Sequence, residues 1–220
     1  MSLASVGANV GARARPKEGA RRTLTRLLLG ATGWVLLASA TPAAAGPLDG
    51  PGAQKALVCS ACHGFAGNSR GDTVPILAGT DTAYLKKALS DYAAGRRPSP
   101  EMEPYAKMAQ HFGVDDIVAY FASQPRQATP VKADPAAAQR GRAAAVQCAV
   151  CHGADGKGDR AKMIPDLTGQ PPGYLRNQLL LFRQDQRSPG DEPLKAVKLL
   201  IGTLSEETIA DLAAYFSTLR

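Results

Sequence analysis

Two five-residue segments, Cys59-Ser60-Ala61-Cys62-His63 and Cys148-Ala149-Val150-Cys151-His152, decide how this 220-residue chain is interpreted. Each has the C-x-x-C-H pattern of a c-type haem attachment site. The two thiols of such a motif add to the haem vinyl groups, and the adjacent histidine becomes an axial ligand of the iron. The sequence therefore predicts two covalently bound haem c groups. Their anchors are Cys59, Cys62, Cys148 and Cys151, and their proximal ligands are His63 and His152.

Other uses of paired cysteines fit the sequence less well. A C-x-x-C pair alone would also suit a disulfide, a redox-active dithiol or half of a zinc site. A four-cysteine zinc site would have to join two motifs about 90 residues apart, and it would leave both histidines without a role. Haem attachment uses all four cysteines of the chain and gives each motif histidine a function.

The first 45 residues have the composition of a secretion signal. A basic stretch with one acidic residue precedes an apolar run from Leu27 to Ala38, and small residues then offer cleavage near Ala40 or Ala45. The apolar run has about a dozen residues, fewer than the ~20 that cross a bilayer. We expect residues 1–45 to be a signal peptide and the protein to be periplasmic. An uncleaved membrane anchor is the alternative.

Most of the net positive charge of the chain lies in this segment. The whole chain carries a formal charge of +7, whereas residues 46–220 contain 20 Lys and Arg against 18 Asp and Glu, or about +2. Such a balance gives no electrostatic basis for binding nucleic acid. No stretch after residue 45 is apolar for long enough to suggest a membrane span, although peripheral association with a membrane stays open.

The chain after residue 45 contains an internal repeat. Three features recur in the same order: the haem motif, a Pro-x-Leu-x-Gly segment and an Ala-Tyr-Phe segment. They begin at Cys59 and Cys148, at Pro75 and Pro165, and at Ala119 and Ala214. The distance between equivalent residues of the two copies grows from 89 positions at the haem motifs to 95 at the Ala-Tyr-Phe segments, mainly because the second copy has five additional residues after Arg187. We expect two homologous domains at residues 50–128 and 135–220, joined by a polar linker at 129–134.

Each copy has the pattern of short helices. Asp134 can cap a helix that begins at Pro135, and Ser205 can cap another whose first turn contains Glu206. Apolar residues recur at helical spacing in the last helix of each copy, at Val114, Ile117, Val118 and Phe121, and at Ile209, Leu212, Ala213, Phe216 and Leu219. No segment alternates as a strand would. We expect an all-α fold in which each small domain is wrapped around its haem.

With these features the chain resembles the dihaem cytochromes c of the c4 type, which consist of two tandem class I cytochrome c domains. The resemblance covers residues 50–220. It rests on both C-x-x-C-H-G motifs, the Pro-x-Leu-x-Gly segments, the Tyr-Leu pairs at Tyr84 and Tyr174, and the Ala-Tyr-Phe segments. It implies periplasmic electron transfer and low-spin haem with His/Met ligation. In that family a proline carbonyl accepts a hydrogen bond from the proximal histidine, and Pro75 and Pro165 match this place.

The resemblance also implies a methionine as the second axial ligand. The segment that starts at Met102 matches the family's Met-x-Pro-x-Ala pattern, so we expect Met102 to bind the first iron and Met108 to pack in the core. In the second copy the matching position is Val197, and residues 187–204 contain no methionine. Four alternatives stay open for the distal position of the second haem: Met163, Lys195, Lys198 or no side chain. Met163 and an open position are favoured.

The sequence thus predicts a periplasmic dihaem cytochrome that carries electrons between redox partners such as an oxidase, another cytochrome or a dehydrogenase. No set of catalytic side chains is evident. Two alternatives are a dihaem oxidoreductase with an unusual second haem and a haem subunit of a larger dehydrogenase complex. Arg97 and Arg187 occupy equivalent places and are candidates for pairing with haem propionates. Because axial ligands move haem potentials across ~0.8 V, we expect the two haems to titrate apart.

Overall fold

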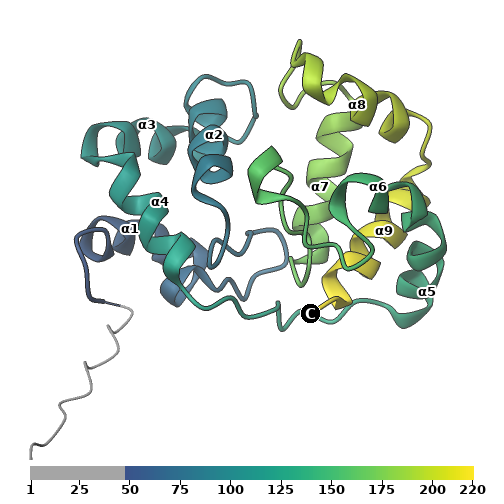
Figure 1. The fold of residues 1–220 in the computed structure, drawn as a ribbon, viewed down its shortest axis with the longest axis horizontal. Coiled ribbons are helices and arrows are strands. Elements are labelled where there is room, and N and C mark those ends of the chain that lie inside the picture. Colours follow the sequence, from purple (N-terminus) through teal and green to yellow (C-terminus); the bar gives the residue numbers. More distant parts are fainter. Residues whose placement is uncertain (1–47) are drawn as a thin grey trace, which may run out of the picture. The chain divides into compact units, whose positions relative to one another are not determined.

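The computed structural model describes residues 48–220, so the signal peptide expected at residues 1–45 lies outside the described part. That part is helical, and its one β-type pairing is an isolated bridge between Asp159 and Ile164. The expected all-α fold is confirmed. The α-helices run in the order α1 (Ala53–His63), α2 (Thr82–Ala93), α3 (Met102–Phe112), α4 (Val114–Ser123), α5 (Pro135–Ala144), α6 (Ala149–His152), α7 (Pro172–Arg183), α8 (Lys195–Gly202) and α9 (Glu206–Thr218) (Figure 1).

The helices form two groups that repeat one packing scheme (Figure 1). We refer to α1–α4 as the first helical group and to α5–α9 as the second. In each group the first helix packs against the last, so α1 contacts α4 and α5 contacts α9. Residues 124–134, between the two groups, contain no helix.

Two equivalent glycines allow these end helices to cross closely. A Cβ built on Gly52 would lie 2.1 Å from the carbonyl oxygen of Asp116, and one built on Gly141 would lie 1.9 Å from that of Asp211. Both distances are far below any real contact, so only a residue without a side chain fits at either crossing. The repeat seen in the sequence therefore extends to the backbone contact that holds each group together.

The helix caps explain where several helices begin. The Asp134 side chain accepts from the amides of Ala136 and Ala137 at the start of α5, and the Ser205 hydroxyl accepts from the amide of Thr208 at the start of α9. Both caps were expected from the sequence. Each satisfies backbone donors that the first turn of a helix otherwise leaves without a partner.

Each group has its own small apolar core. Phe121 and Val118 of α4 are buried in the cluster of the first group, and Leu212 and Phe216 of α9 are buried in that of the second. Few other large apolar side chains are buried in either cluster. Cores of this size commonly need an additional element to be stable, and a covalently attached haem in each group would supply it.

Hydrogen bonds connect the two groups at the segment that follows each haem motif. The side-chain oxygen of Gln170 accepts from the amide of Ile76, and its side-chain nitrogen donates to the carbonyl of Ile76, both at 2.9 Å. Asp72 accepts from the amide of Gly173 at 2.8 Å, at the beginning of α7. These contacts bring α7 of the second group next to the first group.

Candidate haem sites

The first haem motif occupies the last turn of α1. Cys59, Cys62 and His63 stand at i, i+3 and i+4, and this spacing places them on one side of the helix. The helix ends at Gly64, whose φ is +76°, and a Cβ on this glycine would lie 2.3 Å from the carbonyl oxygen of Asn68. A glycine is thus required after the motif, because the backbone at Asn68 packs directly against this position and the φ value is positive. In the second motif, α6 ends in the same way at Gly153, with φ +75°.

Each motif histidine is oriented by a proline carbonyl. His63 Nδ1 lies 2.8 Å from the carbonyl oxygen of Pro75, and His152 Nδ1 lies 3.0 Å from that of Pro165. Burial lowers the pKa of both imidazoles, and these hydrogen bonds oppose the shift only in part. A neutral ring that donates from Nδ1 keeps a lone pair on Nε2, which is the form that binds iron.

The cysteine environments disfavour the other uses of a C-x-x-C pair. All four cysteines are free, and burial raises the pKa of the Cys59 and Cys148 thiols. Redox-active pairs have the opposite property, because their nucleophilic thiol needs a lowered pKa. Within residues 48–220, no three His, Cys, Asp or Glu side chains gather in a way that could hold a metal ion.

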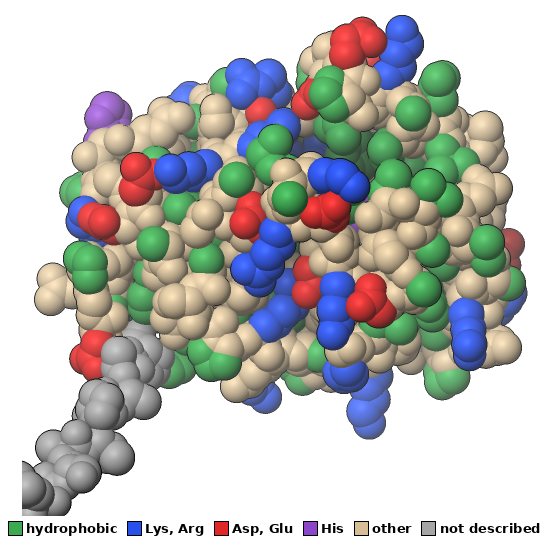
Figure 2. All heavy atoms as spheres, in the orientation of Figure 1, with side chains coloured by type: hydrophobic (Ala, Val, Ile, Leu, Met, Phe, Trp, Pro, Cys, Tyr) green, Lys and Arg blue, Asp and Glu red, His purple; other side chains and the backbone are tan. Residues whose placement is uncertain are grey.

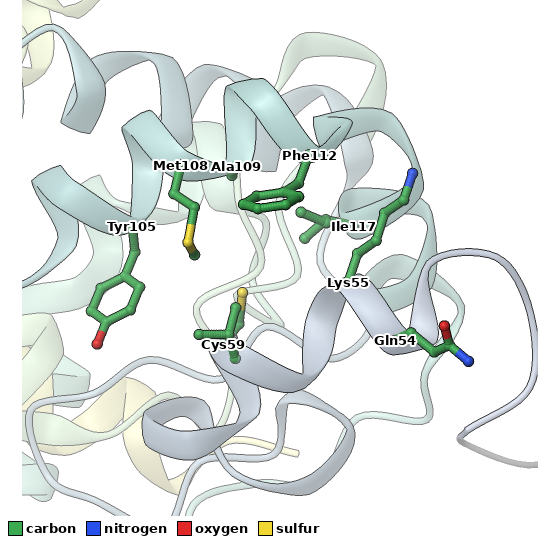
Figure 3. A pocket seen from close by; sticks show the side chains of 9 residues that line it. Gln54, Lys55, Cys59, Tyr105, Met108, Ala109, Phe112 and Ile117 are labelled. Atoms are coloured by element: carbon green, nitrogen blue, oxygen red, sulfur yellow. The ribbon is translucent and has the colours of Figure 1, made fainter.

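An apolar cavity opens beside Cys59 between α1 and α3 (Figure 3). It has a volume of about 360 Å³, and Val58, Tyr105, Met108 and Phe112 are among the residues that line it. Figure 3 shows the Met108 side chain pointing into this space above Cys59. This apolar space lies next to an anchoring thiol, but neither His63 nor Met102 is among its lining residues, so it does not by itself mark the position of the iron.

The two methionines of the first group are therefore placed differently from each other. Met108, expected in the core, borders the cavity next to Cys59. Met102 is the half-buried first residue of α3, and its amide donates to the Ser99 hydroxyl at 3.2 Å. Its role as an iron ligand stays a prediction.

Comparisons with known proteins agree with this geometry. The cytochrome c family profile matches residues 138–220. The fold matches the crystal structure of reduced recombinant cytochrome c4 from Pseudomonas stutzeri with a TM-score of 0.70 and 31% identity, over 80% of this chain and 100% of that one. Cytochrome c4 from Pseudomonas aeruginosa is 35% identical over 88% of this chain and 95% of its own length.

The chain belongs to the cytochrome c4 family. It is accordingly a dihaem c-type cytochrome that transfers electrons, and the Cys59/Cys62 and Cys148/Cys151 pairs fit two C-x-x-C-H haem attachment motifs. A protein named thiosulfate dehydrogenase electron acceptor, from Stutzerimonas stutzeri, is also similar, with 30% identity over 74% of this chain and 79% of its own length.

The second haem motif of this cytochrome lacks an obvious distal partner. Val197, the counterpart of Met102, is a half-buried residue of α8. The Lys198 amine donates to the side chain of Asp185 and to the carbonyl oxygen of Ser188. Lys195 is largely exposed, and Met163 lies in the loop just before Pro165. His111, the one histidine outside the motifs, is an exposed residue in the last turn of α3.

Two buried arginines connect the two helical groups reciprocally. Arg97 donates from Nε to the Gln178 side-chain oxygen at 2.9 Å and from Nη2 to the Tyr174 hydroxyl at 2.8 Å. Arg187 donates from Nη1 to the same Gln178 oxygen at 2.9 Å and from Nη2 to the Tyr84 hydroxyl at 3.0 Å. Tyr84 and Tyr174 are equivalent residues of the repeat, so each arginine binds the tyrosine of the other group. We call these five residues the interface cluster.

The interface cluster carries positive charge without an acidic partner. Arg97 and Arg187 are only 2% and 9% exposed, and neither forms an ion pair with a carboxylate among residues 48–220. Their donor nitrogens are at most 5.8 Å apart, because each lies 2.9 Å from one oxygen. Burial alone would raise the pKa of Tyr84, yet the charges of Arg187 and Arg97 outweigh it and lower the pKa to about 7.

A buried pair of like charges is costly unless an anion lies nearby. The propionates are anionic groups of haem, so they are candidates for this anion. Sequence reasoning identified the two arginines but missed Gln178 and both tyrosines as their partners. The one available signal was that the Tyr-Leu pairs recur at equivalent positions of the repeat.

Proposed function

We propose that this cytochrome carries electrons in the periplasm, from a dehydrogenase or another cytochrome to an oxidase or a further cytochrome. The observation that carries this proposal is the pair of equivalent motifs, each with its histidine Nδ1 held by a proline carbonyl. The composition of residues 1–45 supports export. In residues 48–220, no helix is long and apolar enough to cross a membrane.

The side chains have separate tasks in this function. The four thiols hold the cofactors, and the carbonyls of Pro75 and Pro165 keep His63 and His152 in the orientation that presents Nε2. Met102 is the distal ligand of the first iron. Bound haem supplies a reversible one-electron change at each site. The apolar side chains around Cys59 exclude water, which lowers the reorganisation that each electron transfer requires.

The interface cluster is proposed to hold one or more haem propionates between the two groups. Arg97 and Arg187 come from opposite groups and meet at Gln178, so an anion bound there would contact both halves of the molecule. The cluster would thereby keep the two cofactors at a fixed separation for electron passage between them. Its charge would also favour the reduced, less positive state of both haems.

Replacing Arg97 by glutamine tests the cluster. The variant removes a buried positive charge, so we expect the haem potentials to fall by on the order of 50 mV, the equivalent of about 1 kcal/mol. Arg96→Gln is the matched control, because it removes an exposed charge from the neighbouring position, where Arg96 pairs with Asp91. A spectroelectrochemical titration measures both variants. Equal, small shifts would show that the cluster does not act on the haems.

The function itself is tested with the full chain, expressed in a bacterial host that attaches haem to exported proteins. We expect the pigmented protein in the periplasmic fraction, a mass increased by two haems, pigment that stays with the protein in acidified organic solvent, and two one-electron steps in a redox titration. A colourless protein, or one that releases its pigment, would overturn the proposal.

The relative named as an electron acceptor of thiosulfate dehydrogenase suggests one specific donor class. Mixing oxidised cytochrome with a thiosulfate dehydrogenase and thiosulfate should reduce the haems if such an enzyme is the donor. The control without the dehydrogenase separates the carrier from the oxidoreductase alternative. Reduction by thiosulfate alone would favour an enzyme, and reduction that needs the dehydrogenase would favour the carrier.

A further inference from the structure

We propose that the second haem has an open distal coordination position and binds small uncharged ligands such as carbon monoxide or nitric oxide. This inference rests on the proposed function, because it requires a haem attached at Cys148 and Cys151 with His152 as its proximal ligand. It makes the second group a ligand-binding site beside the electron-transferring first group.

The register of the repeat places an aliphatic residue where the first group has Met102. The Ala-Tyr-Phe segments of α4 and α9 are 95 positions apart, and the same offset leads from Met102 to Val197. Both positions lie near the start of the corresponding helices, α3 and α8. Valine has no donor atom, and residues 187–204 contain no methionine, histidine or cysteine that could replace it.

Lys198 is next to this position, but its amine is bound elsewhere. Its side chain is 13% exposed, and Nζ donates to Asp185 Oδ1 at 2.6 Å and to the carbonyl oxygen of Ser188 at 2.5 Å. An ammonium that donates to these oxygens has no lone pair to offer a metal. The side chain of Lys195 is 69% exposed, and its Nζ lies 3.8 Å from Oε2 of Glu192. Lys195 therefore faces solvent and the Glu192 carboxylate.

The residues inserted after Arg187 contribute contacts to the first group instead of a ligand. The amide of Ser188 donates to the carbonyl oxygen of Arg96 at 2.6 Å, and Asp191 lies 3.3 Å from Lys87. Ser188 and Asp185 have φ values of +50° and +52°, which non-glycine residues rarely adopt. The loop that holds the Lys198 amine is thus itself fixed by the first group.

Met163 belongs to the proximal side of the motif. It follows the turn η3 (Arg160–Lys162) and is 47% exposed. The paired hydrogen bonds between Asp159 and Ile164 hold the ends of its loop, and Pro165 next along the chain accepts from His152 Nδ1. Because Nδ1 is occupied by Pro165, His152 would hold the iron through Nε2, and Met163 adjoins the segment on the Nδ1 side.

The chemistry of the α8 residues indicates the class of ligand. Val197, Leu200 and Ile201, the α8 residues of this stretch that are at least half-buried, are aliphatic, and the Lys198 amine is paired with Asp185. Such surroundings offer a bound molecule no hydrogen bond and no counter-charge. They favour neutral diatomic molecules over anions, because the polarity of a distal pocket governs what the iron accepts.

The test uses the purified dihaem protein. After reduction, carbon monoxide should change the absorption of about one haem in two, and electron paramagnetic resonance of the oxidised protein should show one high-spin and one low-spin haem. In Val197→Met a thioether returns to the distal position, so the affinity for carbon monoxide should fall by more than about tenfold and the high-spin signal should disappear. Val197→Leu is the matched control and should keep both properties.

Two outcomes overturn this inference. One is a protein with two attached haems, both low-spin, that takes up no carbon monoxide. The other is uptake that appears only in Lys198→Ala, Lys195→Ala or Met163→Ala, which would identify that side chain as the ligand. A protein that fails to attach the second haem would show a mass increased by one haem only. That result would contradict the proposed function and not the open distal position.

Discussion

Replacing Met102 by alanine should lower the potential of the first haem by on the order of 0.2 V, on a scale over which axial ligands span ~0.8 V. A thioether ligand stabilises ferrous iron and so raises the potential, and its loss reverses this effect. The variant should also lose the absorption band of the methionine–iron bond. Carbon monoxide should then bind both haems of the reduced protein instead of one. Redox titration and optical spectra measure these three changes together.

Met108→Ala is the matched control, because it removes the same side chain from the same helix. Met108 is half-buried beside the cavity next to Cys59, so its loss enlarges an apolar space and should lower stability by roughly 0.5–3 kcal/mol while the potential changes little. If Met108→Ala abolished the methionine–iron band and Met102→Ala kept it, the ligand would be Met108. The family pattern would then have misidentified the ligand.

The local features of this fold follow directly from the sequence. The caps Asp134 and Ser205, the all-helical class and the haem motifs are set by residues close in sequence, so short-range patterns suffice to predict them. The need for glycine at positions 52 and 141 is different. It arises from carbonyl groups of α4 and α9, which are distant along the chain, and no local pattern reveals such a contact.

The contacts between the two groups could not be predicted from local sequence patterns either. Helical periodicity tells which face of α7 is buried but not what covers it, so it could not show that Gln178 binds the two arginines. Gln170, just before α7, likewise gave no sign that it binds Ile76. The hydrogen bond from Lys198 to Asp185 was also unpredictable, because it requires Asp185 to adopt a positive φ that residues other than glycine rarely adopt.

The conversion of Cys148 and Cys151 together to alanine should leave a protein with one haem and an unfolded second group. The second group buries few large apolar side chains, and α6, which presents His152, has only four residues. Covalent haem favours the folded state as any tightly bound ligand does, and its loss removes that contribution. We expect the mass to increase by one haem only, the helical circular dichroism to fall by roughly half, and proteolysis to begin within residues 135–220.

The matched control is Val150→Ala, which alters an 85%-exposed residue between the same two cysteines and should keep both haems. Cys59 and Cys62 converted together to alanine should give the converse result, with the first group lost. Unfolding of the second group would also remove Tyr174 and Gln178 from Arg97, so the potential of the remaining haem should change as well. A haem-free second group that kept its helicity and its resistance to proteolysis would show that the polypeptide folds without its cofactor, and the interface cluster would then be the main link between the two halves.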